Sequence, residues 1–253
     1  MAAITYSVSD LLRVMQRLRD PDAGCPWDLR QDFKSLVSST LEECYELAQA
    51  IENEDHDHVA EELGDVLFQV VFYAQLGFEQ GLFSFEEVVD TLACKLVRRH
   101  PHVFSDGELE GVVAQKTTVD AVKQSWESIK QEERNAKSQG GILDDVPLAL
   151  PALPRAQKIQ KRAAGVNFDW PDYHGALSKI HEELNELSDA AASGVTDDIE
   201  DEMGDLLFSC VNTARHLGVD AETCLRRANN KFETRFKEVA NLAESSGHSL
   251  DQL

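Results

Sequence analysis

The sequence lacks the features that would place it in a membrane or in an oxidising compartment. No run of apolar residues approaches the ~20 that a membrane-spanning helix needs, so we expect no contact with a membrane. The first six residues form neither a basic nor an apolar segment, so we expect no secretory signal. Five cysteines are present, and no two of them form a CxxC pair. This pattern argues against a disulfide framework or a thiolate zinc site and favours a cytoplasmic location.

Basic residues are scarce. Lysine and arginine total 24 against 46 aspartates and glutamates, which gives a formal net charge of −22 with neutral histidines. A nucleic-acid polymer is bound through lysine and arginine side chains that displace its counterions, so a partner of that kind is excluded. A phosphorylated small molecule remains compatible if divalent cations lie between the two sets of negative charges.

Alternating apolar and polar runs bounded by turn residues are also missing, so β-strands have no support. Apolar residues recur instead at helical spacing, for example at Leu63, Val66, Leu67 and Val70. We therefore predict an all-α protein.

The helical pattern occurs twice. Residues 41–47 (LEECYEL) recur as 181–187 (HEELNEL), and residues 61–68 (EELGDVLF) recur as 201–208 (DEMGDLLF), both at an offset of 140 residues. Such a period is far longer than the ~20–50 residues of solenoid repeats, so we predict two homologous domains. Residues 53–57 and 193–197 are typical of short turns, which makes each repeat an antiparallel helix pair.

Glycine and proline mark the boundary between the repeats. Residues 139–141 (QGG) are followed by Pro147, Pro151 and Pro154, and these breakers predict a linker. We expect an N-terminal helical domain over 1–137, a linker over 138–154 and a C-terminal helical domain over 155–253. The charged segment 119–137 is expected to be the helix that closes the first domain.

Each repeat carries acidic residues at helical spacing. Residues three apart lie on one face of a helix, so antiparallel packing should bring four carboxylates of each repeat together. The first set is Glu43, Glu46, Glu62 and Asp65, and the second set is Glu183, Glu186, Glu202 and Asp205.

Four unpaired carboxylates beside an apolar face would repel one another and resist ionisation. A divalent cation removes this cost, and ligand sets made only of oxygen favour Mg²⁺, with Mn²⁺ as a possible substitute. A di-iron site is disfavoured because no Glu-x-x-His pair is present. The alternative is a solvated acidic face, which the paired recurrence of the motif argues against.

Cations near the carboxylates are candidates for binding phosphate. Lys179 lies four residues before Glu183, and Lys231 and Arg235 are also four apart. The first repeat has Lys95 and Arg99 at that spacing, but it has Ser39 where the second has Lys179. Among the aromatic candidates for base stacking, we expect the tryptophans Trp27 and Trp170 to pack in the core instead.

The sequence resembles the MazG family of nucleoside triphosphate pyrophosphohydrolases, in its two-domain bacterial form. The resemblance rests on the two acidic repeats and on motifs that together span nearly the whole chain: residues 17–19 (RLR), 25–28 (CPWD), 143–147 (LDDVP), 150–153 (LPAL), 156–162 (AQKIQKR), 168–170 (FDW) and 228–236 (ANNKFETRF).

The resemblance implies tandem helical domains, a homodimer with intertwined helices, and Mg²⁺-dependent hydrolysis of NTPs and dNTPs to monophosphates and pyrophosphate. It also implies that the C-terminal repeat is the main catalytic one. Carried over position by position, it implies Mg²⁺ ligands at Glu183, Glu186, Glu202 and Asp205. The implied nucleotide site comprises Lys179, Ile180, His181, Glu182, Glu183, Asp198, Ile199, Glu200, Asp201, Asp205, Lys231, Phe232, Glu233, Thr234 and Arg235.

As a mechanism we expect Glu182 or Glu183 to help deprotonate the attacking water, and Lys231 and Arg235 to stabilise the departing pyrophosphate. Two other classes of function stay open: a nucleotide sensor without turnover, and a structural acidic dimer. The preferred base and sugar, the phosphorus attacked, the number of metal ions and the role of the first domain also stay open.

Overall fold

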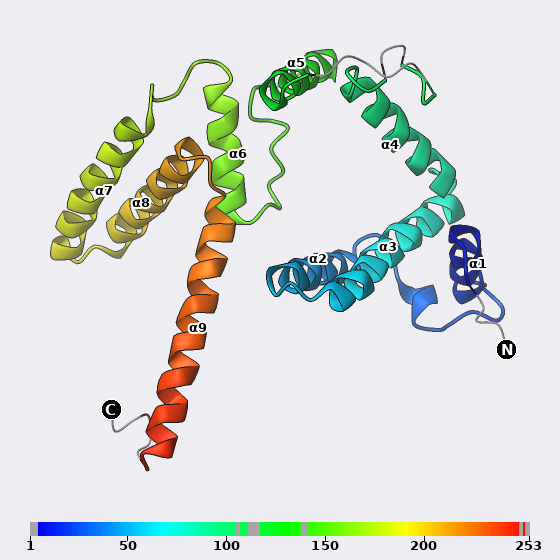
Figure 1. Cartoon of the computed structure of the whole chain (residues 1–253), viewed down its shortest axis with the longest axis horizontal. Helices are drawn as coiled ribbons and strands as arrows, with labels where there is room; N and C mark the ends of the chain where they lie inside the picture. The colour runs from blue at the N-terminus through cyan, green and yellow to red at the C-terminus, as the bar shows by residue number, and fades with distance from the viewer. Residues whose placement is uncertain (1–4, 105–106, 111–116, 138–140, 248–249, 251–253) are drawn as a thin grey trace. The chain divides into compact units, whose positions relative to one another are not determined.

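The computed structural model describes residues 5–104, 107–110, 117–137, 141–247 and 250 (Figure 1). It divides into two compact units, Met1–Ala136 and Lys137–Leu253. The described residues form helices joined by turns and contain no strand, which confirms the predicted all-α fold. None of the described helices is both long and apolar enough to cross a membrane.

The first unit contains an N-terminal helix, a helical hairpin and two further helices. These elements are α1 (Val8–Leu18), the short 3₁₀ helix η1 (Asp28–Arg30), α2 (Val37–Glu52), α3 (His56–Glu79), α4 (Phe85–Arg99) and α5 (Val119–Lys137). The bounds of α5 are those predicted from the sequence. Helices α2 and α3 form the hairpin, and α1 and α4 both contact α3.

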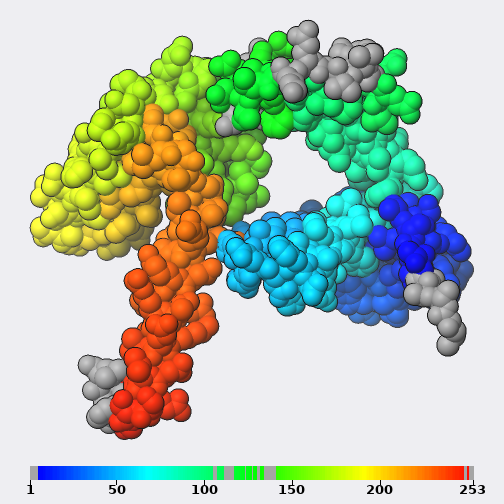
Figure 2. Space-filling view, viewed as in Figure 1, coloured from blue at the N-terminus to red at the C-terminus, as the bar shows by residue number. Residues whose placement is uncertain are grey.

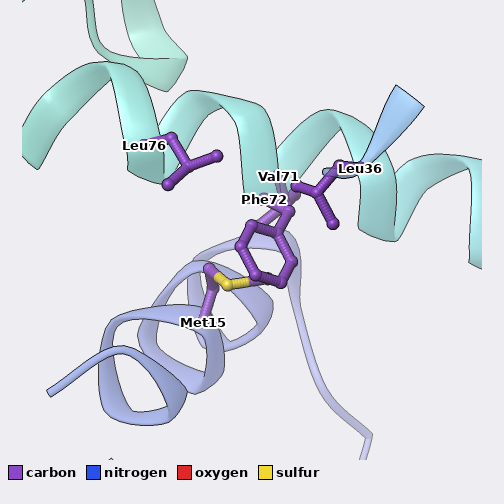
Figure 3. Packing of buried hydrophobic residues seen from close by; sticks show 5 residues of the cluster. All are labelled: Met15, Leu36, Val71, Phe72 and Leu76. Carbon is purple, nitrogen blue, oxygen red and sulfur yellow. The ribbon is translucent and has the colours of Figure 1, made fainter. Parts of the chain in front are cut away.

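The core of the first unit lies between α1 and α3. Met15 of α1 faces Phe72 of α3, and Leu36, Val71 and Leu76 complete the buried cluster (Figure 3). Local signals fix the helix starts: Ser7 and Ser84 each form a capping box with the acidic residue three positions later.

The second unit repeats the hairpin. It consists of α6 (Ala152–Ala164), α7 (Tyr173–Ser193), α8 (Thr196–His216) and α9 (Ala221–Ser245). Helices α7 and α8 pair closely, and α6 packs on α8 and α9. Gly194 ends α7 in the left-handed conformation with φ 74°, which a glycine adopts without the strain of a Cβ atom.

The hairpin turns are shorter than predicted. Only residues 53–55 separate α2 from α3, because Asp55 caps α3 and makes His56 its first residue. Residues 194–195 alone separate α7 from α8. Residues 138–140, at the start of the predicted linker, lie outside the described residues, and α6 already begins at Ala152, so the domain boundaries stay a prediction.

The hairpins bury only a narrow stripe of their apolar residues. Val71 and Val211 occupy equivalent positions in α3 and α8, and each is 1% exposed. Leu63, Leu67 and Leu207 belong to the same helical patterns yet are at least one-third exposed. Each hairpin therefore has an apolar face that the described residues of the chain leave partly exposed.

Candidate active site

The second hairpin brings three of the four predicted carboxylates together. Glu183 and Glu186 project from α7 and Glu202 from α8, and each offers an oxygen within 4.8 Å of the others. Asp205 lies on the exposed surface of α8 outside this group. The second acidic cluster is therefore Glu183, Glu186 and Glu202.

Glu183 is the unusual member of the second acidic cluster because it is only 3% exposed. Its Oε1 accepts from Lys179 Nζ at 2.6 Å, whereas its Oε2 is buried without a hydrogen-bond partner among the described residues. A buried carboxylate oxygen without a partner carries a desolvation penalty. Such an atom fits a site that is completed by a cation.

Lys179 lies next to the second acidic cluster, one helical turn before Glu183 on α7. Its Nζ is also 2.9 Å from Glu182 Oε1 and 4.0 Å from Glu186 Oε2. The hydrogen bonds to Glu183 and Glu182 raise the pKa of Lys179 above its ordinary value, so the ammonium stays charged. Loss of hydration raises the pKa of Glu186, and Glu183 and Glu202 raise it further against the opposing charge of Lys179.

The first hairpin builds an equivalent group. Glu43 and Glu46 of α2 meet Glu62 of α3 within 4.8 Å, and these residues form the first acidic cluster. Asp65 lies outside that distance, although its charge still acts on Glu43. Loss of hydration raises the pKa of Glu43, and the charges of Asp65, Glu46 and Glu62 add to the rise.

Both clusters fit a hard divalent cation. Their donors are carboxylate oxygens alone, which Mg²⁺ and Mn²⁺ prefer. The raised pKa values of Glu43, Glu62 and Glu186 show that the clusters resist carrying their full negative charge. A bound cation would remove that resistance.

The remaining predicted residues of α7 and α8 are close in the sequence to Glu183 and Glu202 of the second acidic cluster. Ile180 is half-buried, while His181 is exposed and its Nδ1 lies 2.9 Å from the carbonyl oxygen of Leu177. Asp198, Glu200 and Asp201 are exposed and Ile199 is half-buried within the first two turns of α8.

The predicted residues of α9 are not joined to the second acidic cluster. Lys231, Phe232, Glu233, Thr234 and Arg235 are all exposed, and α9 packs on α6 and α8. On the face shown in Figure 2, the C-terminal part of α9 (orange to red) projects away from the other helices of its unit. Within the described residues, no ion pair or hydrogen bond connects the side chains of Lys231 and Arg235 to the carboxylates. Their predicted role at the phosphates stays a prediction.

The expectation that Trp27 and Trp170 are core residues is wrong. Trp27 is 57% exposed, because the loop is anchored by Arg19 and buried Asp28 rather than by the indole. Trp170 is half-exposed and lies against Gly175 of α7, where an added Cβ would come within 2.7 Å of the indole ring.

Two ion-pair groups were not predicted from the sequence. Asp169 pairs with Arg215 and His216 and so fixes the loop before α7 to the end of α8. Glu133 of α5 binds Arg98 at 2.6 Å and Arg99 at 2.5 Å. The partners are far apart in the sequence, so no local spacing rule indicates them.

The fold and the two acidic clusters define a class: an all-α protein of two homologous helical units, each with a carboxylate site suited to a divalent cation. The MazG nucleotide pyrophosphohydrolase domain matches twice, at residues 31–104 and 172–240. These ranges correspond to α2–α4 and to α7 with α8 and most of α9. The chain belongs to the MazG family, which confirms the resemblance and the class of hydrolase acting on phosphoric anhydride bonds.

Relatives match along nearly the whole chain. A nucleoside triphosphate pyrophosphohydrolase of Escherichia coli (strain K12) is 50% identical over 242 residues, which cover 95% of this chain and 89% of the relative. A nucleoside triphosphate pyrophosphohydrolase/pyrophosphatase MazG of Thermotoga maritima is 46% identical over 244 residues, covering 96% and 89%. An uncharacterized protein YabN of Bacillus subtilis is 41% identical over 246 residues, which cover 97% of this chain and 48% of YabN.

Proposed function

We propose that this protein is a Mg²⁺-dependent nucleoside triphosphate pyrophosphohydrolase. It converts NTPs and dNTPs to the monophosphates and pyrophosphate, and it thereby removes nucleotides from the cellular pool. The names of the relatives from Escherichia coli and Thermotoga maritima support the reaction. The observation that carries the proposal is the buried, unpartnered Oε2 of Glu183 within a cluster of three carboxylates.

The residues of the second acidic cluster have distinct roles in this proposal. Glu183, Glu186 and Glu202 would hold the cation, and Asp205, three residues after Glu202 on α8, would be the fourth ligand. A Mg²⁺ ion held there would neutralise charge on the phosphate chain and activate a water molecule. Glu182 is exposed and hydrogen-bonded to Lys179, so it lies at the edge of the site, where it or Glu183 would help to deprotonate the attacking water.

Cations complete the substrate site. Lys179 is held at the acidic cluster, where it can meet a phosphate oxygen. Lys231 and Arg235 stabilise the departing pyrophosphate, which requires α9 of this chain or of a second copy to approach the hairpin. We propose a homodimer for this reason, and because the apolar faces of both hairpins are exposed. We also propose a cytoplasmic location.

A product assay tests the proposal. Full-length protein is incubated with each NTP and dNTP in the presence of Mg²⁺, and pyrophosphate and monophosphate are measured by chromatography. Pyrophosphate release distinguishes the enzyme from a nucleotide sensor, which would bind its ligand without producing it. Orthophosphate as the first product would mean that water attacks the terminal phosphorus of the nucleotide, and this result would contradict the proposal.

The matched variants Glu186→Gln and Glu46→Gln locate the turnover. The two residues occupy equivalent positions and both are exposed, so neither substitution opens a cavity in the core. We expect Glu186→Gln to lower kcat/KM at least about 100-fold, because a ligand of the metal that activates the water is lost. Glu46→Gln should retain most turnover if the second unit is the main catalytic one. Equal losses in the two variants would assign turnover to both units.

A further inference from the structure

The two acidic clusters are built alike, but only the second contains a lysine. Lys179 Nζ lies 2.6 Å from Glu183 Oε1 and 2.9 Å from Glu182 Oε1. The residue 140 positions earlier is Ser39, which carries no charge. The cation that neutralises part of the second acidic cluster therefore has no counterpart on α2.

The first acidic cluster has weak compensation from other groups. Asp65, Glu46 and Glu62 all act unfavourably on ionised Glu43. His58 acts favourably on ionised Glu62, but its Nδ1 also lies 3.3 Å from Asp55 Oδ2. The first acidic cluster therefore has a larger uncompensated negative charge than the second.

We infer that Lys179 is the resident counter-cation of the second acidic cluster, so that without nucleotide a divalent cation binds the first cluster more tightly than the second. The inference rests on the proposed function, because it takes the carboxylates as metal ligands. A divalent cation that binds the free Oε2 of Glu183 shares this carboxylate with the ammonium of Lys179, which lies 2.6 Å from Oε1 and repels the cation. This cost does not arise in the first cluster.

A nucleotide changes this balance at the second site. Its phosphate oxygens offer Lys179 a new anionic partner, so the ammonium can leave Glu183 as the substrate binds. Both oxygens of Glu183 are then available to a cation that arrives with the phosphate chain. The two units thus differ in metal affinity: the first binds a divalent cation tightly without nucleotide, and the second binds one tightly only together with the nucleotide.

The test measures Mn²⁺ binding to nucleotide-free, full-length protein by electron paramagnetic resonance of the unbound ion. Wild-type protein should show two classes of site that differ in Kd by at least about tenfold, since one unit charge near 4 Å changes affinity by this order or more. Glu46→Gln should remove the tighter class, and Glu186→Gln should remove the weaker one. These two variants assign each class to its cluster.

Exchanging the residue that differs between the clusters gives the decisive measurement. We expect Lys179→Gln to tighten the weaker class at least about fivefold and Ser39→Lys to weaken the tighter class by a similar factor. Glutamine can still donate a hydrogen bond to Glu183, so Lys179→Gln removes the charge while keeping a partner for the buried carboxylate. Ser39→Lys adds a charge at a half-buried position of α2, and circular dichroism checks that both variants are folded.

The outcomes separate the inference from the proposed function. Equal affinities in wild-type protein, or a Kd that neither exchange changes, would overturn the role of Lys179 while pyrophosphate release could still be observed. Mn²⁺ binding at neither cluster of the nucleotide-free protein would overturn the inference, and the assay of pyrophosphate release would decide the proposed function separately. If the Kd for Mn²⁺ changes as predicted in the two exchange variants but no nucleotide is hydrolysed, the inference is supported and only the enzymatic proposal is contradicted.

Discussion

Glu183 shows how a single residue can serve function at the expense of stability. Its carboxylate is 3% exposed, and one of its oxygens has no hydrogen-bond partner in the described part of the chain. An apolar side chain of similar volume would fill the same space between α7 and α8 without a desolvation penalty. We infer that a glutamate is used here because the metal site needs it.

This argument predicts the effect of Glu183→Met. The substitution should raise the free energy of unfolding by about 1 kcal/mol, because a buried, half-satisfied carboxylate is replaced by an apolar chain. Lys179 keeps Glu182 as a partner and is itself about one-third exposed, so it is not left as an unpaired buried charge. Urea unfolding in the presence of EDTA gives the measurement, and turnover should be lost in the same variant.

Two controls make the Glu183→Met result interpretable. Glu186→Met replaces an exposed carboxylate of the same cluster and should change stability much less, because exposed positions contribute little. Glu183→Ala should be less stable than Glu183→Met, since it leaves a cavity. A Glu183→Met protein less stable than wild type would show that the carboxylate is well satisfied, against our interpretation.

At the scale of elements, α5 is joined to α4 by one carboxylate between two arginines. Arg99 and Arg98 lower the pKa of Glu133 to about 2, from the ordinary value of 4.5. A carboxylate whose pKa is lowered on folding stabilises the fold above its ordinary pKa and loses that contribution as the pH falls through the lowered value. The contact should therefore hold α5 in place above pH 4.5 and weaken between pH 4.5 and about 2.

The matched variant for this contact is Glu133→Gln. At pH 6, hydrogen exchange measured by mass spectrometry should be faster for peptides from α5 in the variant than in wild type, because the charged contact is lost. The difference between the two proteins should shrink as the pH falls from 4.5 towards 2, where wild-type Glu133 also becomes neutral. A difference independent of pH would indicate that packing, rather than charge, holds α5.

Much of the arrangement of the helices was predictable from the sequence. Helical periodicity and the repeat at an offset of 140 residues predicted the hairpins of α2 with α3 and of α7 with α8. The charged segment 119–137 predicted the bounds of α5. Spacing on one face predicted that Glu183, Glu186, Glu202 and Asp205 meet, and the first three of these carboxylates do. Trp27 was predicted wrongly, since the residues next to it in the sequence do not show that more than half of its surface is exposed.

The contacts that were not predictable join segments far apart in the chain. Glu133 of α5 meets Arg98 of α4 across a sequence separation of 35 residues, and Asp169 meets Arg215 across 46. Charge alone does not select these partners in a chain with 46 acidic residues. The position of α9 depends on contacts that its own sequence does not specify.

At the scale of the whole molecule, the exposed apolar faces repeat with the sequence. Leu63 and Leu67 of α3 correspond to Met203 and Leu207 of α8, and all four are between 38% and 52% exposed. An amphipathic helix normally buries such a stripe, and a contiguous exposed apolar surface indicates an interaction site. Its recurrence on both units, beside both acidic clusters, fits a second copy of the chain better than an unrelated partner.

The homodimer prediction can be tested at Leu207. A glutamate there would place a charge within the apolar face of the second hairpin, and burial of an unpaired carboxylate in an interface is costly. Light scattering coupled to size-exclusion chromatography should give twice the chain mass of 28.2 kDa for wild type and a lower mass for Leu207→Glu. Leu148→Glu is the matched control, because Leu148 is 83% exposed and lies outside the helices, so that variant should stay dimeric. A monomeric wild type, or a Leu207→Glu dimer as stable to dilution as the wild type, would mean that this face is covered in some other way, and the approach of a second copy's α9 to the second acidic cluster would lose its basis.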